Sequence, residues 1–268
     1  MIRGLDLDQI RQSLNRDCEL WLFEKIDSTN EQALLKVKQG SILPLACFAE
    51  EQTQGRGRRG KVWFSPAGGS IYLSLAWKFD LPVNALGCLP LAMGVAVARV
   101  LKDLGLQQVG LKWPNDVLLD DKKIAGILIE TSQITAKSTT AIIGVGLNFK
   151  LSDELADVPT QPWTDIVSSL GLECPPDRNK VAGALLHECI AVCEAFTHAK
   201  HNLMMEYQEQ YDVCMRQIVN VYLEGGQVMQ GVVDGFEKNG EIRILIEGEP
   251  QLFNSADISL RKASNVND

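Results

Sequence analysis

The stretch "GRGRRGKV" (55–62) decides which fold we expect, because three phosphate-binding patterns fit it. Its glycines match the G-x-G-x-x-G of dinucleotide folds, and its G-K pair matches most of the P-loop pattern. Its four cations would also suit a nucleic-acid patch. The first two patterns require a helix that begins on the glycines. Here the stretch lies between a buried apolar run, "PLACFAEE" (44–51), and "WFSPAGGSIYLSL" (63–75), which has no helical period. The sequence therefore predicts a loop between two strands.

The composition of this loop favours a small anionic ligand. Glycines leave a loop conformationally free, and guanidinium groups match the oxygens of carboxylates and phosphates. Val62 stands where a P-loop needs a serine or threonine for Mg²⁺. A nucleic-acid patch and a plain solvated turn stay open as alternatives, although a formal net charge of -8 argues against a long polyanion as the main partner.

Length and cysteine usage predict a cytoplasmic protein with reduced thiols. The chain has 268 residues, enough for a large core without disulfides, and its seven cysteines include no C-x-x-C pair. The chain opens on a polar, periodic segment, so we expect no leader. The longest apolar stretch, 85–101, is interrupted by Gly87, Pro90, Gly94 and Arg99, so we expect no membrane span.

Periodicity and turn residues predict a large first domain and a small second one. Ser28 and Glu31 have the spacing of a capping box at the start of a helix that ends near Gly40. After about residue 215, short strands separated by glycine-containing turns predict a closed β-barrel. We expect domains at 1–214 and 215–264 and a tail at 265–268. The expected strands are 20–26, 44–51, 70–79, the hairpin-forming runs in 109–131, 139–149, and four strands within 218–261. The expected helices are 5–14, 27–40, 84–105 and 177–211.

Three further motifs carry polar groups that could face a ligand. "DSTN" (27–30) places hydroxyls and an amide at a helix start, although Ser28 could serve simply as a cap. "KWPND" (112–116) interrupts strand pairing at its proline, and "KKIAG" (122–126) returns a lysine to the same region if the two runs form a hairpin. Taken singly, the last two are an ordinary turn and a solvated lysine.

The ordered set of motifs resembles the biotin–protein ligase family. "DSTN", "GRGRRG" with "WFSPAGG", "KWPND" with "KKIAG", and "GVGLN" (144–148) follow one another in that family's order between about residues 20 and 150. The resemblance implies an α/β fold: a mixed-sheet catalytic domain of the class II synthetase-like biotin/lipoate ligase type, followed by a small SH3-like barrel. It also implies activation of biotin with ATP and Mg²⁺ to biotinyl-5′-AMP. Biotin is then transferred to one lysine of a biotin carboxyl carrier protein, as in acetyl-CoA carboxylase.

The resemblance also implies roles for individual residues, with Lys123 and Arg58 as the catalytic pair. No fixed protein metal site is implied; Mg²⁺ would arrive with ATP near Asn115 or Asp116. The residues implied for biotin are Ser28, Thr29, Asn30, Gln52, Gly55, Arg56, Gly57, Arg58, Lys123 and Gly126. Those implied for ATP and the adenylate are Arg56, Arg58, Trp63, Lys112, Asn115, Asp116, Gly146 and Asn148.

Several alternatives and departures accompany this interpretation. Some family members carry an amino-terminal winged helix-turn-helix, and about 20 residues before the resemblance are too few for one, so we expect no nucleic-acid partner. A lipoate ligase is the enzymatic alternative, and a small-ligand sensor or nucleic-acid-binding module is the non-enzymatic one. A homodimer is compatible with the sequence. Cys189 and Cys193 with nearby histidines suggest zinc, but helical spacing favours a packed apolar face.

Overall fold

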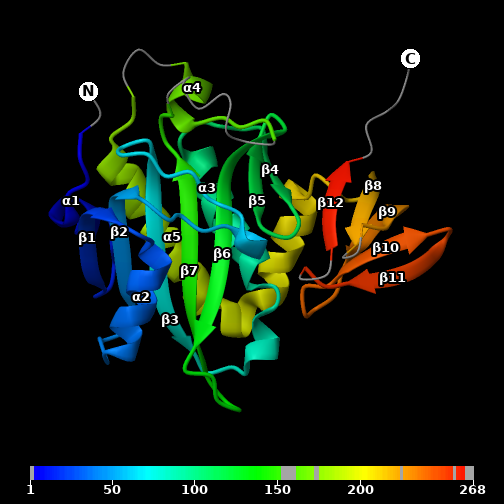
Figure 1. Ribbon diagram of the computed structural model, residues 1–268, viewed down its shortest axis with the longest axis horizontal. Coiled ribbons are helices and arrows are strands. Elements are labelled where there is room, and N and C mark those ends of the chain that lie inside the picture. Colours follow the sequence, from blue (N-terminus) through cyan, green and yellow to red (C-terminus); the bar gives the residue numbers. More distant parts are fainter. Residues whose placement is uncertain (1–2, 152–160, 172–174, 224–225, 256–257, 263–268) are drawn as a thin grey trace.

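Seven strands form the larger sheet, in the order β1-β2-β3-β7-β6-β5-β4 (Figure 1). The fold is seen in a computed structural model that describes residues 3–151, 161–171, 175–223, 226–255 and 258–262. Strands β1 and β2 pair in parallel and the other neighbours pair antiparallel, which confirms the mixed sheet. The strands are β1 Glu19–Ile26, β2 Leu45–Gln52, β3 Ser70–Phe79, β4 Val109–Lys112, β5 Asp116–Leu119, β6 Lys122–Ser132 and β7 Thr139–Asn148.

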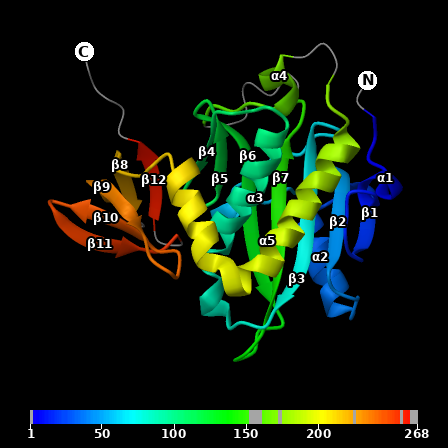
Figure 2. The ribbon, with the colours of Figure 1, turned by 180° about the vertical axis from the view of Figure 1, so that it is seen from behind.

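Helices cover both faces of this sheet. The glycine–arginine loop and the polar motifs lie on one of these faces. Helix α2 (Thr29–Lys38) lies over β2 and β3 on the face turned toward the viewer in Figure 1. Helices α3 (Leu89–Asp103) and α5 (Arg178–Glu206) cover the opposite face, as Figure 2 shows. The other α-helices of the described residues are short: α1 (Leu7–Arg11) and α4 (Ile166–Leu170).

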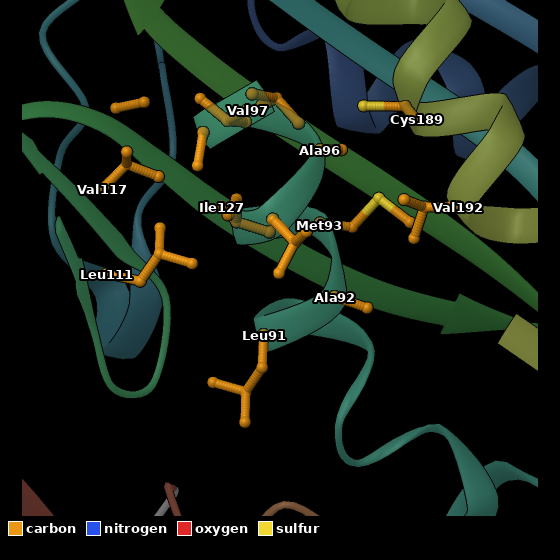
Figure 3. Packing of buried hydrophobic residues seen from close by; sticks show 14 of the residues in the cluster. Leu91, Ala92, Met93, Ala96, Val97, Leu111, Val117, Ile127, Cys189 and Val192 are labelled. Atoms are coloured by element: carbon orange, nitrogen blue, oxygen red, sulfur yellow. The ribbon is translucent and has the colours of Figure 1, made fainter. Parts of the chain in front are cut away.

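Helix α3 is the centre of the core. Its side chains Met93 and Val97 pack toward β-strand residues such as Ile127 and toward Cys189 and Val192 of α5 (Figure 3). The segment Val83–Asp103 is long and apolar enough to cross a membrane, but 67% of the relevant window is buried inside the protein, as in a core helix. Its apolar composition is therefore explained by its position between the sheet and α5.

Two of the predicted helices differ from their expected form. The helix expected at 84–105 divides into a 3₁₀ turn, Val83–Leu86, and α3, because Pro90 suits only the first turn of an α-helix. The helix expected at 177–211 is capped by Asp177, whose side chain accepts from the backbone NH of Asn179. It leaves helical geometry at Ala199 and ends in a π-helical turn, η4 (Tyr207–Tyr211).

A second, antiparallel sheet follows, in the order β11-β10-β9-β8-β12. It matches the all-β segment expected after residue 215, with one strand, β11, that the turn pattern did not predict. The tail expected at 265–268 lies outside the described residues, as does Cys174. The strands are β8 Ile218–Leu223, β9 Val228–Phe236, β10 Ile242–Ile246, β11 Glu249–Phe253 and β12 Ile258–Lys262.

The two sheets are joined by a backbone-to-backbone contact. Gly87 lies directly against Asn239 and Gly240 in the β9–β10 turn, so a Cβ atom on either glycine would overlap the backbone of the other segment. The indole Nε1 of Trp113, which is 2% exposed, donates to the carbonyl oxygen of Gly240 at 3.0 Å. The Cys88 thiol lies 3.2 Å from the carbonyl oxygen of Lys238. The smaller sheet is therefore fixed beside the hairpin that carries "KWPND".

Candidate functional site

The glycine–arginine loop folds back on itself between β2 and β3. Arg56 and Val62 form an isolated antiparallel bridge, and Arg58–Gly60 form a short 3₁₀ turn with Arg59 at a φ of 56°. The next long element is β3, so the helix that dinucleotide and P-loop motifs require is replaced by a strand. Gly55 has no room for a side chain, because a Cβ atom there would overlap the carbonyl oxygen of Trp63.

The polar end of α2 lies beside this loop and is held by a hydrogen-bond chain. The Gln52 side-chain oxygen accepts from the backbone NH of Thr29 at 2.8 Å and from its hydroxyl at 3.0 Å. Gln52 in turn donates to the Ser65 hydroxyl at 2.9 Å. The Ser74 hydroxyl on β3 lies 2.8 Å from Thr29 Oγ1 and 2.6 Å from Asn30 Oδ1. Thr29 and Asn30, from "DSTN", and Gln52, implied by the resemblance, are thus brought together.

The predicted capping box at Ser28 is wrong. Ser28 stands at the N-cap position with extended backbone but makes no side-chain cap bond. Glu31, the other half of the predicted box, instead lies 3.3 Å from Arg56 Nη2. The loop arginine therefore takes the carboxylate that the local sequence pattern assigned to helix capping.

Arg56 is held by carboxylates from two elements. Its Nη2 donates to Glu130 Oε2 on β6 at 2.8 Å and lies near Glu31 on α2. The side chains of Arg56 and Glu130 are 38% and 33% exposed, so the pair is accessible to water and to a competing anion. Sequence reasoning identified Arg56 and missed both of its partners.

Trp63 lies against two glycines on neighbouring strands. Gly126 on β6 is paired with Gly146 on β7. A Cβ atom added at Gly126 would approach the indole to 2.9 Å, and one at Gly146 would approach it to 2.5 Å. The Lys123 ammonium lies 5.3 Å from the centre of the Trp63 ring. Among the described residues, the buried Trp63 Nε1 has no hydrogen-bond partner.

Lys123 forms the central ion pair of the site. Its ammonium lies 2.5 Å from Asp116 Oδ1, and the two side chains are 18% and 17% exposed. The predicted hairpin is confirmed: β5 and β6 are paired, with a register shift at Val117/Leu118. This low exposure reduces screening, so the pair fixes both charges more firmly than a surface ion pair would.

Arg58 reaches across the site toward both sheets. Its Nη1 donates to Asn115 Oδ1 at 3.3 Å, and its Nη2 donates to the carbonyl oxygen of Ser255, between β11 and β12. Burial lowers the pKa of Arg58 from its usual value, and the neighbouring Arg59 acts in the same direction, while Asp116 opposes the shift. An anion that replaced these neutral partners would stabilise the charged form of the Arg58 guanidinium.

The remaining predicted polar residues lie around the Lys123–Asp116 pair, and two of them already donate hydrogen bonds to the backbone. Asn115 donates its amide to the carbonyl oxygen of Ile127 at 2.8 Å, and Lys112 is paired with Asp116 across β4 and β5. The buried Asn148 donates to the carbonyl oxygen of Thr164 at 3.0 Å, so its side chain already serves the fold.

The residues that sequence reasoning missed are Glu31, Ser65, Ser74, Glu130 and Ser255. Glu31 was assigned to a cap and Ser65 lies within "WFSPAGG" without a role of its own, whereas Ser74, Glu130 and Ser255 lie in strands or ordinary turns and outside any motif. Their only sequence signal is that a polar residue interrupts an apolar strand at Ser74.

A metal would find oxygen donors here, but the site does not resemble a resident metal centre. Within the part of the chain that the structure describes, no group of three or more His, Cys, Asp or Glu side chains could hold a metal ion. Asp116 supplies a carboxylate and Asn115 an amide oxygen, the hard donors that Mg²⁺ accepts alongside phosphate oxygens. Cys189 is fully buried, and desolvation raises its pKa to about 12, as expected for a packed thiol.

Comparisons with known proteins point to one family. The Biotin/lipoate A/B protein ligase family matches residues 22–148. The bifunctional ligase/repressor BirA of Escherichia coli is 35% identical over 242 residues, covering 89% of this chain and 73% of the relative. The biotin–[acetyl-CoA-carboxylase] ligase of Mycobacterium tuberculosis is 34% identical over 236 residues, covering 86% of this chain and 85% of the relative.

A solved structure is similar over nearly the same span. The biotin protein ligase of Aquifex aeolicus in complex with biotin and ATP superposes with a TM-score of 0.73 at 26% identity, covering 91% of this chain and 99% of that one. The agreement extends across both sheets. This chain belongs to the biotin/lipoate A/B protein ligase family.

Proposed function

We propose that this chain is an ATP-dependent biotin–protein ligase. It would convert biotin and ATP to biotinyl-5′-AMP and diphosphate, and then transfer biotin to a lysine of a biotin carboxyl carrier protein. The observation that carries the proposal is the position of Arg56, Arg58 and Lys123, which all contact residues of β5 and β6 or the turn before them, beside the polar end of α2. The relatives named above support biotin and ATP as the substrates.

Biotin would occupy the side of the site nearest α2. Thr29, Asn30 and Gln52 are fixed by their mutual chain of hydrogen bonds and are therefore oriented before a ligand arrives. We assign the same role to Ser28, whose hydroxyl is not used as a cap, and to the loop residues Gly55, Arg56 and Gly57. Lys123 and Gly126 would lie at the carboxylate end of biotin.

The first half-reaction needs two anions to meet. A carboxylate oxygen of biotin forms a bond to the α-phosphorus of ATP, the bond to the β-phosphate oxygen breaks, and diphosphate leaves. Coulomb repulsion opposes this approach, and in the transition state negative charge is concentrated around the α-phosphate. Lys123 and Arg58 would neutralise that charge, and Asp116 would hold the Lys123 ammonium in place.

ATP would occupy the side bordered by the "KWPND" turn. We assign Trp63, Lys112 and Gly146 to the nucleotide, together with Asn115, Asp116 and Asn148. Mg²⁺ bound with ATP supplies further neutralisation of the phosphates, and Asn115 and Asp116 are the oxygen donors closest to that role. Asn148 would act through its backbone, because its side chain is engaged with Thr164.

In the second half-reaction the ε-amine of a carrier lysine would form a bond to the acyl carbon, with loss of a proton and departure of AMP. The loop would exclude water from the mixed anhydride until then. We further propose a homodimer, a reducing cytoplasmic location consistent with the burial of six cysteines among the described residues, and domains at 1–214 and 215–264.

The direct test is to supply purified protein with ATP, Mg²⁺ and either biotin or lipoate, together with an apo-carrier. Diphosphate release and a carrier mass increased by biotin are expected, with no increase from lipoate. A gain in mass with lipoate instead would identify the lipoate alternative. Saturable nucleic-acid binding at physiological salt without diphosphate release would favour the non-enzymatic alternative.

A further inference from the structure

Glu130 joins the two halves of the site through a single carboxylate oxygen. Its Oε2 accepts from Asn30 Nδ2 at 2.8 Å and from Arg56 Nη2 at 2.8 Å. Asn30 belongs to α2 and Arg56 to the loop, while Glu130 lies on β6. Neither motif contains Glu130, and the proposed function assigns it no role.

The bond to Glu130 fixes which way the Asn30 amide points. Asn30 Oδ1 lies 2.6 Å from the Ser74 hydroxyl, and Asn30 Nδ2 lies 2.8 Å from the Glu130 carboxylate. An ionised carboxylate only accepts hydrogen bonds, so the amide nitrogen must face it. Gly144 packs against this amide so closely that a Cβ atom there would overlap Asn30 Oδ1. Asn30 Nδ2 also donates to the carbonyl oxygen of Leu128 at 3.5 Å, so the amide is held in one orientation by partners on α2's neighbouring strands.

The bond from Arg56 has a different consequence. Both contacts use the Nη2 nitrogen of Arg56, so an anionic ligand that bound this nitrogen would replace at least part of the pairing with Glu130 and Glu31. Both pairs are more than 30% exposed, so their net worth is small and a ligand anion can displace them. The carboxylates thus provide a resting position for Arg56 beside the place where it is needed.

We propose that Glu130 is a positioning residue with two separable tasks: it orients Asn30 toward biotin, and it holds Arg56 in an ion pair that ligand binding exchanges for a ligand anion. The inference rests on the proposed function, because it takes the ligand to be biotin and its adenylate. It extends that function by identifying the residue that couples the biotin end of the site to the loop.

Two substitutions separate the tasks. Glu130→Gln keeps a side-chain oxygen that can accept from Asn30 but removes the charge that holds Arg56. Glu130→Ala removes both. Glu31→Gln is the matched control, because it weakens only the longer Arg56 contact, at 3.3 Å, and leaves Asn30 untouched. Each variant is studied as the full chain, with biotin calorimetry, the KM for biotin and kcat for diphosphate release, and the rate of tryptic cleavage after Arg58 or Arg59.

The proposal expects a split between the two variants. Glu130→Ala should raise the Kd and KM for biotin by roughly tenfold or more, the usual effect of losing a hydrogen bond to a charged group, with kcat changed by less than about threefold. Glu130→Gln should keep wild-type biotin affinity or bind more tightly, because the competing charge is gone. Both should be cleaved in the loop faster than the wild type, and Glu31→Gln should show a smaller acceleration.

Equal biotin affinities for Glu130→Gln and Glu130→Ala would overturn the Asn30 task, and unchanged loop cleavage in both would overturn the Arg56 task. If Glu130→Ala does not fold, the glutamine variant alone decides the Arg56 task through its cleavage rate, and a tenfold loss of biotin affinity in it would overturn the Asn30 task. A wild-type protein that binds no biotin would instead refute the proposed function.

Discussion

Replacement of Lys123 by methionine tests whether its charge is needed where the two substrate anions meet. Methionine keeps most of the side-chain length and removes the ammonium, so the Lys123–Asp116 pair changes from neutral to a single negative charge. The substituted site would then repel both the biotin carboxylate and the triphosphate. The first half-reaction should suffer much more than the binding of biotin.

The magnitude follows from the burial of the pair. Unit charges about 4 Å apart interact by about 4 kcal/mol at an effective dielectric constant of about 20. Side-chain exposures of 18% and 17% place this pair near that regime rather than in bulk water. Loss of one preorganised group that stabilises transition-state charge typically costs about 10²–10³ in kcat. We therefore expect kcat for diphosphate release to fall by about that factor.

The assay is single-turnover release of diphosphate with saturating biotin and ATP. Lys122→Met is the control, because Lys122 is the exposed neighbour at the start of β6. The double variant Lys123→Met/Asp116→Asn should recover part of the lost rate, since it removes the unpaired carboxylate. Diphosphate release within about threefold of wild type in Lys123→Met, or an equal loss in Lys122→Met, would refute the reasoning.

Three other changes give distinct outcomes. Arg58→Gly should let the adenylate escape and label lysines of added bystander proteins, measured by streptavidin blotting, whereas Arg59→Gly should resemble wild type; equal labelling by both contradicts the role of Arg58. Arg178 is 1% exposed at its side chain and lies 2.6 Å from Glu50, so Arg178→Ala should lower the urea unfolding free energy by about 3–5 kcal/mol, and a loss below about 1 kcal/mol would show that the pair is not effectively buried. The Cys189 thiol has its pKa raised by burial from 9.0 to about 12, so its contribution to stability is present below pH 9 and is lost as pH rises from about 9 to 12; urea midpoints should fall over that range, and a flat profile argues against the shift.

The strands and the position of the loop could be predicted from the sequence because they depend on local patterns. The segment 70–79 forms β3 with the predicted bounds, since its aromatic and β-branched residues suit a strand on any reading. The division of the helix expected at 84–105 was missed although Pro90 is a local signal for it, because the apolar run continues across the break.

The partners of the charged side chains could not be predicted. Glu31 has the spacing of a capping residue, yet the loop arginine lies close enough in space to take it. The contact between Arg58 and Ser255 joins residues 197 positions apart, and no local pattern encodes such a pairing. The sequence therefore identifies most of the charged residues of the site. Only the fold shows which of them are already paired with another side chain or a backbone group.

The apposition of Gly87 and Gly240 limits how the two halves of the chain can be recombined. Neither position tolerates a side chain while the other segment keeps its path. A chimera that grafts a foreign carboxy-terminal module onto this catalytic half would need a glycine at each side of the seam, together with a carbonyl in reach of Trp113. Compatibility of swapped modules should therefore depend on one tight turn rather than on the similarity of the modules as a whole.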